Sequence, residues 1–223
     1  MPTRHLQLVK RLRHITYNCE GETLPGRQLK NYRANFSLLV LLILMDINAF
    51  WQIIESACNS DPTSAEDWDI RLISVLQELS ADEIVTWNNI FDNLACDAYR
   101  VDMWAVAYII NGGASDDGFY YFRCWLIGMG RVAYELAYEN PDNLADVISP
   151  NWVSEGIDAE AEIYAAATQA WMKVTGETND AAFPSRQETV ELAGEPWDFE
   201  DDAETAKRLP RLFRLYDEHD DAL

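Results

Sequence analysis

Residues 104–131 constrain the fold of this chain more than any other stretch. Trp104 and Tyr108 lie one helical turn apart, within a run of apolar side chains that repeats at helical spacing. The adjacent Gly112 and Gly113 then end the run, because a glycine just past a helix readily adopts the left-handed conformation of a C-cap. We therefore expect a helix, a tight turn and a second helix here.

The second of these helices is apolar on almost every side. Large apolar side chains occupy most of its positions: Phe119, Tyr120, Phe122, Trp125, Leu126 and Ile127. A helix that is apolar all round belongs at the centre of a domain. No convincing strand pattern of period two occurs elsewhere in the sequence. The sequence therefore predicts an all-α fold, a compact multi-helix domain around a central buried helix-turn-helix at about residues 101–138.

Polar residues stand at the start of the second helix and within it. Ser115, Asp116 and Asp117 follow the glycine turn, where any of them can cap the second helix by accepting hydrogen bonds from free backbone N–H groups. The charge of the two aspartates also faces the positive end of the helix dipole. Arg123 shares the apolar face, and a buried guanidinium needs a carboxylate or several carbonyl groups as partners. We favour an internal ion pair between Arg123 and Asp116 or Asp102, which would set how the two helices cross.

The alternative interpretation is a functional polar site. In it, Arg123 holds an anionic group, and Asp116 or Asp117 acts as a base or as a ligand. The residues of this candidate polar site are Asp116, Asp117, Arg123, Arg131, Asp102 and Trp104, with aromatic rings as walls. Two adjacent carboxylates are too few oxygen ligands for a divalent cation, so we predict neither a metal nor a cofactor. A surface for a partner protein is the third interpretation.

The central motif resembles a bacterial protein family. The pattern W-x-x-A-Y-I-I-x-G-G-x-S-D-D-x-F-x-x-F-R-x-W-L-I-x-x-G begins at Trp104 and continues to Gly130, and it is long enough to be specific. Two flanking motifs agree with it, M-x-x-x-x-F-W-x-I-I at 45–54 and E-I-Y-A-A-A-x-x-A at 162–170. Over roughly residues 45–176, the chain resembles the domain of unknown function 4240 family. The resemblance implies a compact helical domain that occurs alone or beside other modules in bacteria, and it assigns no catalytic residue.

Three regions of the chain differ in composition. Residues 1–44 form a basic extension with seven Lys and Arg against two Asp and Glu, and we expect it to be mis-annotated upstream sequence or disordered. Its apolar run at 36–45 is shorter than the roughly 20 residues that a membrane span needs. Residues 45–176 form the helical domain, and 177–223 an acidic linker with a short basic amphipathic helix. We favour docking of this helix on the acidic body of its own chain; docking on another protein is the alternative.

Further helices surround the central motif. The apolar spacing predicts three before it, at 45–60, 65–79 and 81–99. Ser80 and Glu83 form a capping box at the start of the third. After the motif, Ser154 is expected to cap a long helix that Gly176 closes.

The charge of the chain limits its partners. The net charge is −21, and the body from residue 45 onwards carries ten Lys and Arg against 36 Asp and Glu. Such a body repels nucleic acids and anionic membranes, so neither is an expected partner. It attracts a basic protein, and solubility alone is the competing explanation.

Cysteine and histidine usage excludes several kinds of site. The four cysteines stand far apart in the sequence, and two of the three histidines precede residue 15. We therefore expect no zinc site, and no Cys–His or Ser–His–Asp catalytic group in the body. Reduced, buried thiols indicate a cytoplasmic protein.

These features support two classes of function. The first is a protein-binding or inhibitory module, immunity-like or regulatory, with a basic partner. The second is a small enzyme or ligand-binding domain with an Asp/Arg polar site at 112–131. We prefer the first because the body lacks a nucleophile–base pair. Whether the chain is an enzyme stays open.

Overall fold

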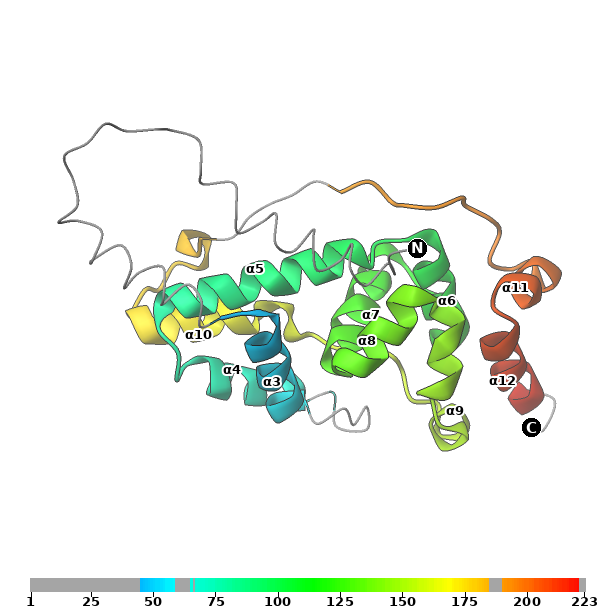
Figure 1. Cartoon of the computed structure of the whole chain (residues 1–223), viewed down its shortest axis with the longest axis horizontal. Helices are drawn as coiled ribbons and strands as arrows, with labels where there is room; N and C mark the ends of the chain where they lie inside the picture. Colours follow the sequence, from blue (N-terminus) through cyan, green and yellow to red (C-terminus); the bar gives the residue numbers. More distant parts are fainter. Residues whose placement is uncertain (1–44, 59–64, 66, 185–189, 221–223) are drawn as a thin grey trace, which may run out of the picture. The chain divides into compact units, whose positions relative to one another are not determined.

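The computed structural model describes residues 45–58, 65, 67–184 and 190–220, and within them the chain is all-α (Figure 1). The α-helices are α3 (Ile47–Cys58), α4 (Trp68–Leu76), α5 (Ala81–Asp97), α6 (Val101–Asn111), α7 (Asp116–Gly128), α8 (Arg131–Glu139), α9 (Pro150–Glu155), α10 (Ala166–Thr175), α11 (Asp202–Arg208) and α12 (Pro210–Asp220). Short 3-10 turns are η2 (Pro141–Asp146), η3 (Ile163–Ala165) and η4 (Asp180–Ala182). The predicted extension at residues 1–44 lies outside the described residues. No helix in the described part is long and apolar enough to span a membrane.

Helix α7 is the buried centre of the domain, as its composition predicts. Phe119, Phe122, Trp125 and Leu126 are each at most 2% exposed. The helix packs against α3, α5, α6 and α8, so its apolar side chains meet neighbours in several directions. A helix with apolar neighbours on several sides is stabilised by burial of its side chains more than by the helix propensity of its own sequence.

The turn between α6 and α7 has the predicted geometry. Gly112 ends α6 in the left-handed conformation with φ of 63°, which a residue with a Cβ rarely adopts. The Ser115 hydroxyl oxygen then caps α7 by accepting a hydrogen bond from the Gly118 N–H at 3.1 Å. The predicted capping box of α5 is also present, with Ser80 and Glu83 bonded in both directions.

A second group of helices closes the core around two tryptophans. Helix α4 packs on α3 and α10, and α10 packs on α5. Trp68 and Trp87 are buried at their centre. A Cβ added at Gly128 would lie 2.3 Å from the Trp68 Cζ3 atom, so the close approach of Trp68 to the end of α7 requires a glycine.

The long helix predicted over 154–176 is wrong in its first half. Helix α9 begins earlier, at Pro150, and Gly156 ends it in the left-handed conformation with φ of 61°. Residues 157–162 are not helical, and α10 follows only after η3. The apolar residues at helical spacing therefore belong to two separate helices and to the loop between them.

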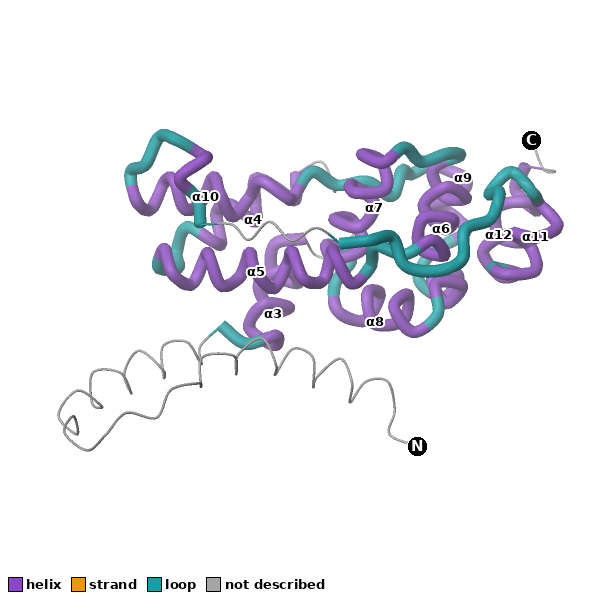
Figure 2. Tube along the Cα trace, turned by 90° about the horizontal axis from the view of Figure 1, so that it is seen from above, coloured by secondary structure: helices purple, strands orange, loops and turns teal. Residues whose placement is uncertain are grey.

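Residues 190–220 lie against the body of their own chain, and Figure 2 shows their first part as a loop that leads past α6 to α11. Ala193 forms a single parallel bridge with the residues that open α6. Its carbonyl accepts a hydrogen bond from Val101 N at 2.9 Å, and its N–H donates to the Tyr99 carbonyl at 3.2 Å.

Helix α12 is attached to η2 by a buried carboxylate. Asp142 is only 4% exposed and accepts hydrogen bonds from the N–H groups of Arg211 and Leu212 at 2.9 and 3.0 Å. Leu209 and Leu212 bury their side chains against the body, and Arg211 pairs with Asp146 at the surface. The basic helix therefore docks within its own chain.

Candidate functional site

The two adjacent aspartates of the predicted polar site lie in the first turn of α7. Asp116 and Asp117 are both exposed. Neither one forms an ion pair with Arg123 or with any other described residue. Their position at the positive end of the helix dipole stabilises α7 without requiring a ligand.

Arg123 has aromatic and carbonyl partners in place of the predicted aspartate. Its Nη1 group donates to the Ala95 carbonyl of α5 at 2.8 Å, and its guanidinium lies 4.8 to 5.1 Å from the ring centres of Tyr99, Phe119 and Tyr120. The favoured ion pair with Asp116 or Asp102 is therefore not present among the described residues. Burial lowers the pKa of Arg123, because removing water disfavours its charge.

Asp102 pairs instead with the arginine that precedes α6. Arg100 donates from both Nε and Nη2 to the two oxygens of Asp102, and from Nη1 to the Tyr138 carbonyl at 2.8 Å. A planar guanidinium suits this two-pronged contact with a carboxylate. The bond from Arg100 to the Tyr138 carbonyl joins the start of α6 to the end of α8.

The remaining predicted residues also have structural partners. Arg131 pairs with Glu135 at 2.8 Å and donates to the Asn48 side chain at 2.9 Å. Trp104 donates from its indole N–H to the Ala114 carbonyl at 3.0 Å and stacks on Phe119. Within the described residues, the six side chains of the candidate polar site form no hydrogen bond or ion pair with one another.

A different group of residues shares one surface beside the start of α7. We call it the acidic–tyrosine surface, and its members are Asp117, Asp158, Glu160, Glu162, Tyr120, Tyr121 and Tyr164. They come from α7, from the loop 157–162 and from η3.

Backbone contacts hold the loop 157–162 against α6 and α7. Ala159 N donates to the Asn111 side-chain oxygen at 2.8 Å, and Ala161 N donates to the Tyr121 carbonyl at 3.2 Å. Gly118 also lies beneath the loop, since a Cβ there would lie 3.1 Å from Glu160 Oε1. Carboxylates distant in sequence thereby meet the first turn of α7.

Ring contacts and charges show that this surface is one cluster. The Tyr164 ring centre lies 5.7 Å from that of Tyr120 and 6.0 Å from that of Tyr121. Tyr164 raises the pKa of Tyr121, and burial, Glu162 and Asp117 raise it further. Burial raises the pKa of Glu160, and the neighbouring carboxylates add to the effect because like charges disfavour ionisation.

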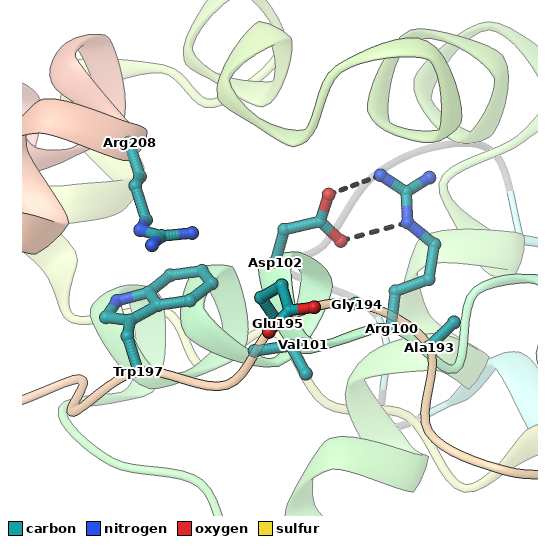
Figure 3. A pocket seen from close by; sticks show the side chains of 8 residues that line it. All are labelled: Arg100, Val101, Asp102, Ala193, Gly194, Glu195, Trp197 and Arg208. Carbon is teal, nitrogen blue, oxygen red and sulfur yellow. Dashed lines mark hydrogen bonds and ion pairs between the residues drawn. The ribbon is translucent and has the colours of Figure 1, made fainter.

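The structure also contains a small pocket of about 200 Å³ beside α6 (Figure 3). Its lining residues are Arg100, Val101, Asp102, Ala193, Gly194, Glu195, Trp197 and Arg208. The guanidinium carbon of Arg208 lies over the Trp197 ring, 4.4 Å from its centre, and Arg208 pairs with Glu204 at 2.6 Å. Of the predicted site residues, only Asp102 lines this pocket.

Sequence reasoning missed both of these features. The acidic–tyrosine surface depends on the break at Gly156, and the pocket depends on a contact between α6 and the segment after residue 190. The available signal for the first was the pair Glu160 and Glu162 close to Tyr164 in sequence, but a continuous helix would have placed Glu162 on a different face from Glu160 and Tyr164.

Burial shifts the pKa values of titratable groups in the core. Burial raises the pKa of Asp92 to about 6, although a hydrogen bond from Asn88 at 2.8 Å opposes that shift. Burial likewise raises the pKa of the Cys124 thiol to about 12, which keeps it protonated and unreactive. The described residues contain no group of His, Cys, Asp or Glu side chains arranged to hold a metal ion.

One protein-family model matches residues 45–173, which is more than half of the chain. The family is described as Protein of unknown function (DUF4240). No curated protein and no solved structure matches the chain. The matched range contains the whole acidic–tyrosine surface, whereas Ala193 to Arg208 of the pocket lie beyond it. On the strength of this match, which agrees with the motif around Trp104, the chain belongs to the DUF4240 family.

Proposed function

We propose that this chain is a protein-binding module whose acidic–tyrosine surface receives a segment rich in lysine and arginine from a basic partner. One observation supports this most strongly. Asp117, Asp158, Glu160 and Glu162 share a surface with three tyrosine rings, and no described cation pairs with any of these carboxylates.

The chemistry of this surface suits guanidinium and ammonium groups. Carboxylates attract them, and the face of a tyrosine ring adds about 0.5–1 kcal/mol for each exposed cation that it contacts. Tyr164 is 39% exposed, so its ring is accessible to a partner. The acidic body as a whole would speed the encounter with a basic protein.

A module of this kind acts by covering basic residues of its partner. If those residues belong to a functional site, the module is inhibitory or regulatory, which is the role we infer. We place this activity in the bacterial cytoplasm, where widely separated cysteines stay reduced.

The competing function, an enzyme or ligand-binding centre at 112–131, has less support. Arg123 is occupied by the Ala95 carbonyl and three aromatic rings, and Asp116 and Asp117 are exposed. A reacting group would need these side chains to converge on one position.

Calorimetric titration of the full chain with a short peptide of lysine and arginine residues tests the proposal. The variant Asp117→Asn/Asp158→Asn/Glu160→Gln/Glu162→Gln removes the charges of the surface. Each exposed ion pair is worth about 0.3–0.5 kcal/mol, so affinity should fall by about tenfold. Raising the salt concentration should weaken binding of the parent more than that of the variant.

A second variant separates this surface from the overall charge. Glu55→Gln/Glu78→Gln/Glu139→Gln/Glu155→Gln removes the same charge from exposed positions elsewhere, and it should bind the peptide almost as tightly as the parent. Equal losses in the two variants would mean that only the net charge matters. Tyr164→Phe should retain binding, whereas Tyr164→Ala should weaken it, because the ring face provides the contact.

A further inference from the structure

The pocket beside α6 lies where the family-matched body meets the segment that follows it. The bridge between Arg100 and Ala193 brings the two together, and Gly194 and Glu195 continue along the pocket wall. Figure 3 shows Arg208 and Trp197 on one side of the hollow, with Asp102 and Glu195 on the other.

One side of the pocket presents a guanidinium. The Nε group of Arg208 donates to Glu204, and the guanidinium carbon lies 4.4 Å from the centre of the Trp197 ring. No described residue accepts a hydrogen bond from either Nη group of Arg208. A guanidinium held over a ring in this way, with both Nη groups available, is suited to bind a carboxylate with two parallel hydrogen bonds.

The opposite side presents carboxylates. Arg100 balances the charge of Asp102, but Glu195 has no ion-pair partner among the described residues. A ligand that carried only negative charge would therefore meet Glu195 unfavourably, and one that carried only positive charge would meet Arg208 unfavourably. The two sides together favour a ligand that has both charges at separate ends.

The volume of the pocket limits the size of that ligand. Drug-sized molecules occupy pockets of about 300–1,000 Å³, whereas a cavity of about 150 Å³ accommodates benzene. A pocket of about 200 Å³ therefore has room for a molecule of about the size of a single amino acid.

We propose that this pocket binds a small zwitterion with one carboxylate and one ammonium group, such as a free amino acid. The carboxylate lies on the Nη groups of Arg208, and the ammonium group lies against Glu195 and Asp102. Because the pocket is formed by α6 together with residues 193–208, the bound zwitterion also fastens the segment after residue 190 to the body. This site is separate from the acidic–tyrosine surface.

Calorimetry and thermal unfolding of the full chain with glycine, β-alanine and γ-aminobutyrate test this proposal. At least one of the three should bind and raise the melting temperature, whereas propionate and propylamine, which each lack one of the charges, should do neither at the same concentration. Hydrogen–deuterium exchange of residues 190–200 should slow in the presence of the zwitterion that binds. The proposal is overturned if none of the three binds, or if propionate binds as tightly as the zwitterions.

Two pairs of variants locate the site. Glu195→Gln and Arg208→Gln should each weaken zwitterion binding by at least about tenfold, since each removes a charged hydrogen-bond partner. Glu191→Gln and Lys207→Gln are the matched controls, because they change neighbouring exposed residues of the same charge outside the pocket lining, and they should leave affinity unchanged. Should Arg208→Gln disturb the Trp197 stack, Glu195→Gln still decides the matter, and unaltered binding by that variant contradicts the assignment.

Discussion

Replacing Gly128 by alanine should destabilise the fold through a clash with Trp68. The added Cβ would lie 2.3 Å from Cζ3 and 2.5 Å from Cε3 of the indole, whereas carbon atoms pack best at about 3.5–4.0 Å. Trp68 has no exposed surface, so the ring has no solvent to move into. Overpacking of this size destabilises the fold by about 3 kcal/mol. The better helix propensity of alanine offsets about 1 kcal/mol of that loss, so the free energy of unfolding should fall by about 2 kcal/mol.

Urea unfolding of the full chain measures this effect, with an unchanged dependence on denaturant as evidence that only stability has altered. Gly118→Ala is the matched control in the same helix, because its Cβ would meet the movable end of Glu160 at 3.1 Å and would contact Ser115 Oγ at an ordinary 3.5 Å. That variant should stay within about 1 kcal/mol of the parent. Trp68→Phe removes the clashing atoms, so Gly128→Ala should cost less in that background. Equal stability of Gly128→Ala and the parent would refute the packing argument.

Three further predictions concern Asp92, Asp142 and Arg123. Burial raises the pKa of Asp92 from 3.8 to about 6, so the folded state favours the neutral carboxyl and loses stability as pH rises from about 4 through about 6. After allowance for partial exposure, Asp92→Asn should stabilise the fold by about 1–2 kcal/mol at about pH 8 and by little at about pH 4, as measured by urea unfolding. Asp142→Ala leaves the first N–H groups of α12 without their acceptor. It should lower the free energy of unfolding by about 1–2 kcal/mol and speed hydrogen exchange in that helix. The control Asp146→Ala removes an exposed ion pair and should lower the free energy of unfolding by less than about 1 kcal/mol. Arg123→Met should lower stability by about 1–3 kcal/mol in thermal unfolding, and Arg123→Lys should not restore it, since lysine lacks the planar group that stacks on the rings.

Local patterns in the sequence predict the centre of this fold well. The Gly112 turn, the Ser115 cap and the all-round apolar α7 depend on neighbouring residues, and such signals are visible in a linear chain. The capping box at Ser80 is of the same kind. These features position the family motif and explain why it is rich in glycine and aromatic residues.

The partner of Arg123 depends on contacts between helices, so its type could not be read from spacing. The sequence reasoning required a carboxylate or several carbonyls, and it favoured an aspartate. The structure supplies two carbonyls, that of Ala95 at 2.8 Å and that of Phe119 at 3.4 Å, together with the faces of three rings. Aromatic faces attract cations through their quadrupole, and Tyr99, which follows α5 in the chain, reaches α7 only when the two helices pack.

For a related reason, neither the acidic–tyrosine surface nor the pocket could be predicted from the sequence. Gly156 interrupts a run whose apolar spacing continues on both sides, so periodicity alone favours one unbroken helix over 154–176. The bridge from Arg100 to Ala193 joins residues that are far apart in the chain. No local pattern in either segment indicates that contact.

Residue-resolved NMR mapping of the lysine- and arginine-peptide on the full chain tests most directly whether the family motif presents a binding surface. We expect saturable chemical-shift changes at residues 117–121 and 158–164, and their loss when Asp117, Asp158, Glu160 and Glu162 are neutralised together. Changes spread evenly over the exposed carboxylates, or confined to residues 200–217, would contradict the proposed function.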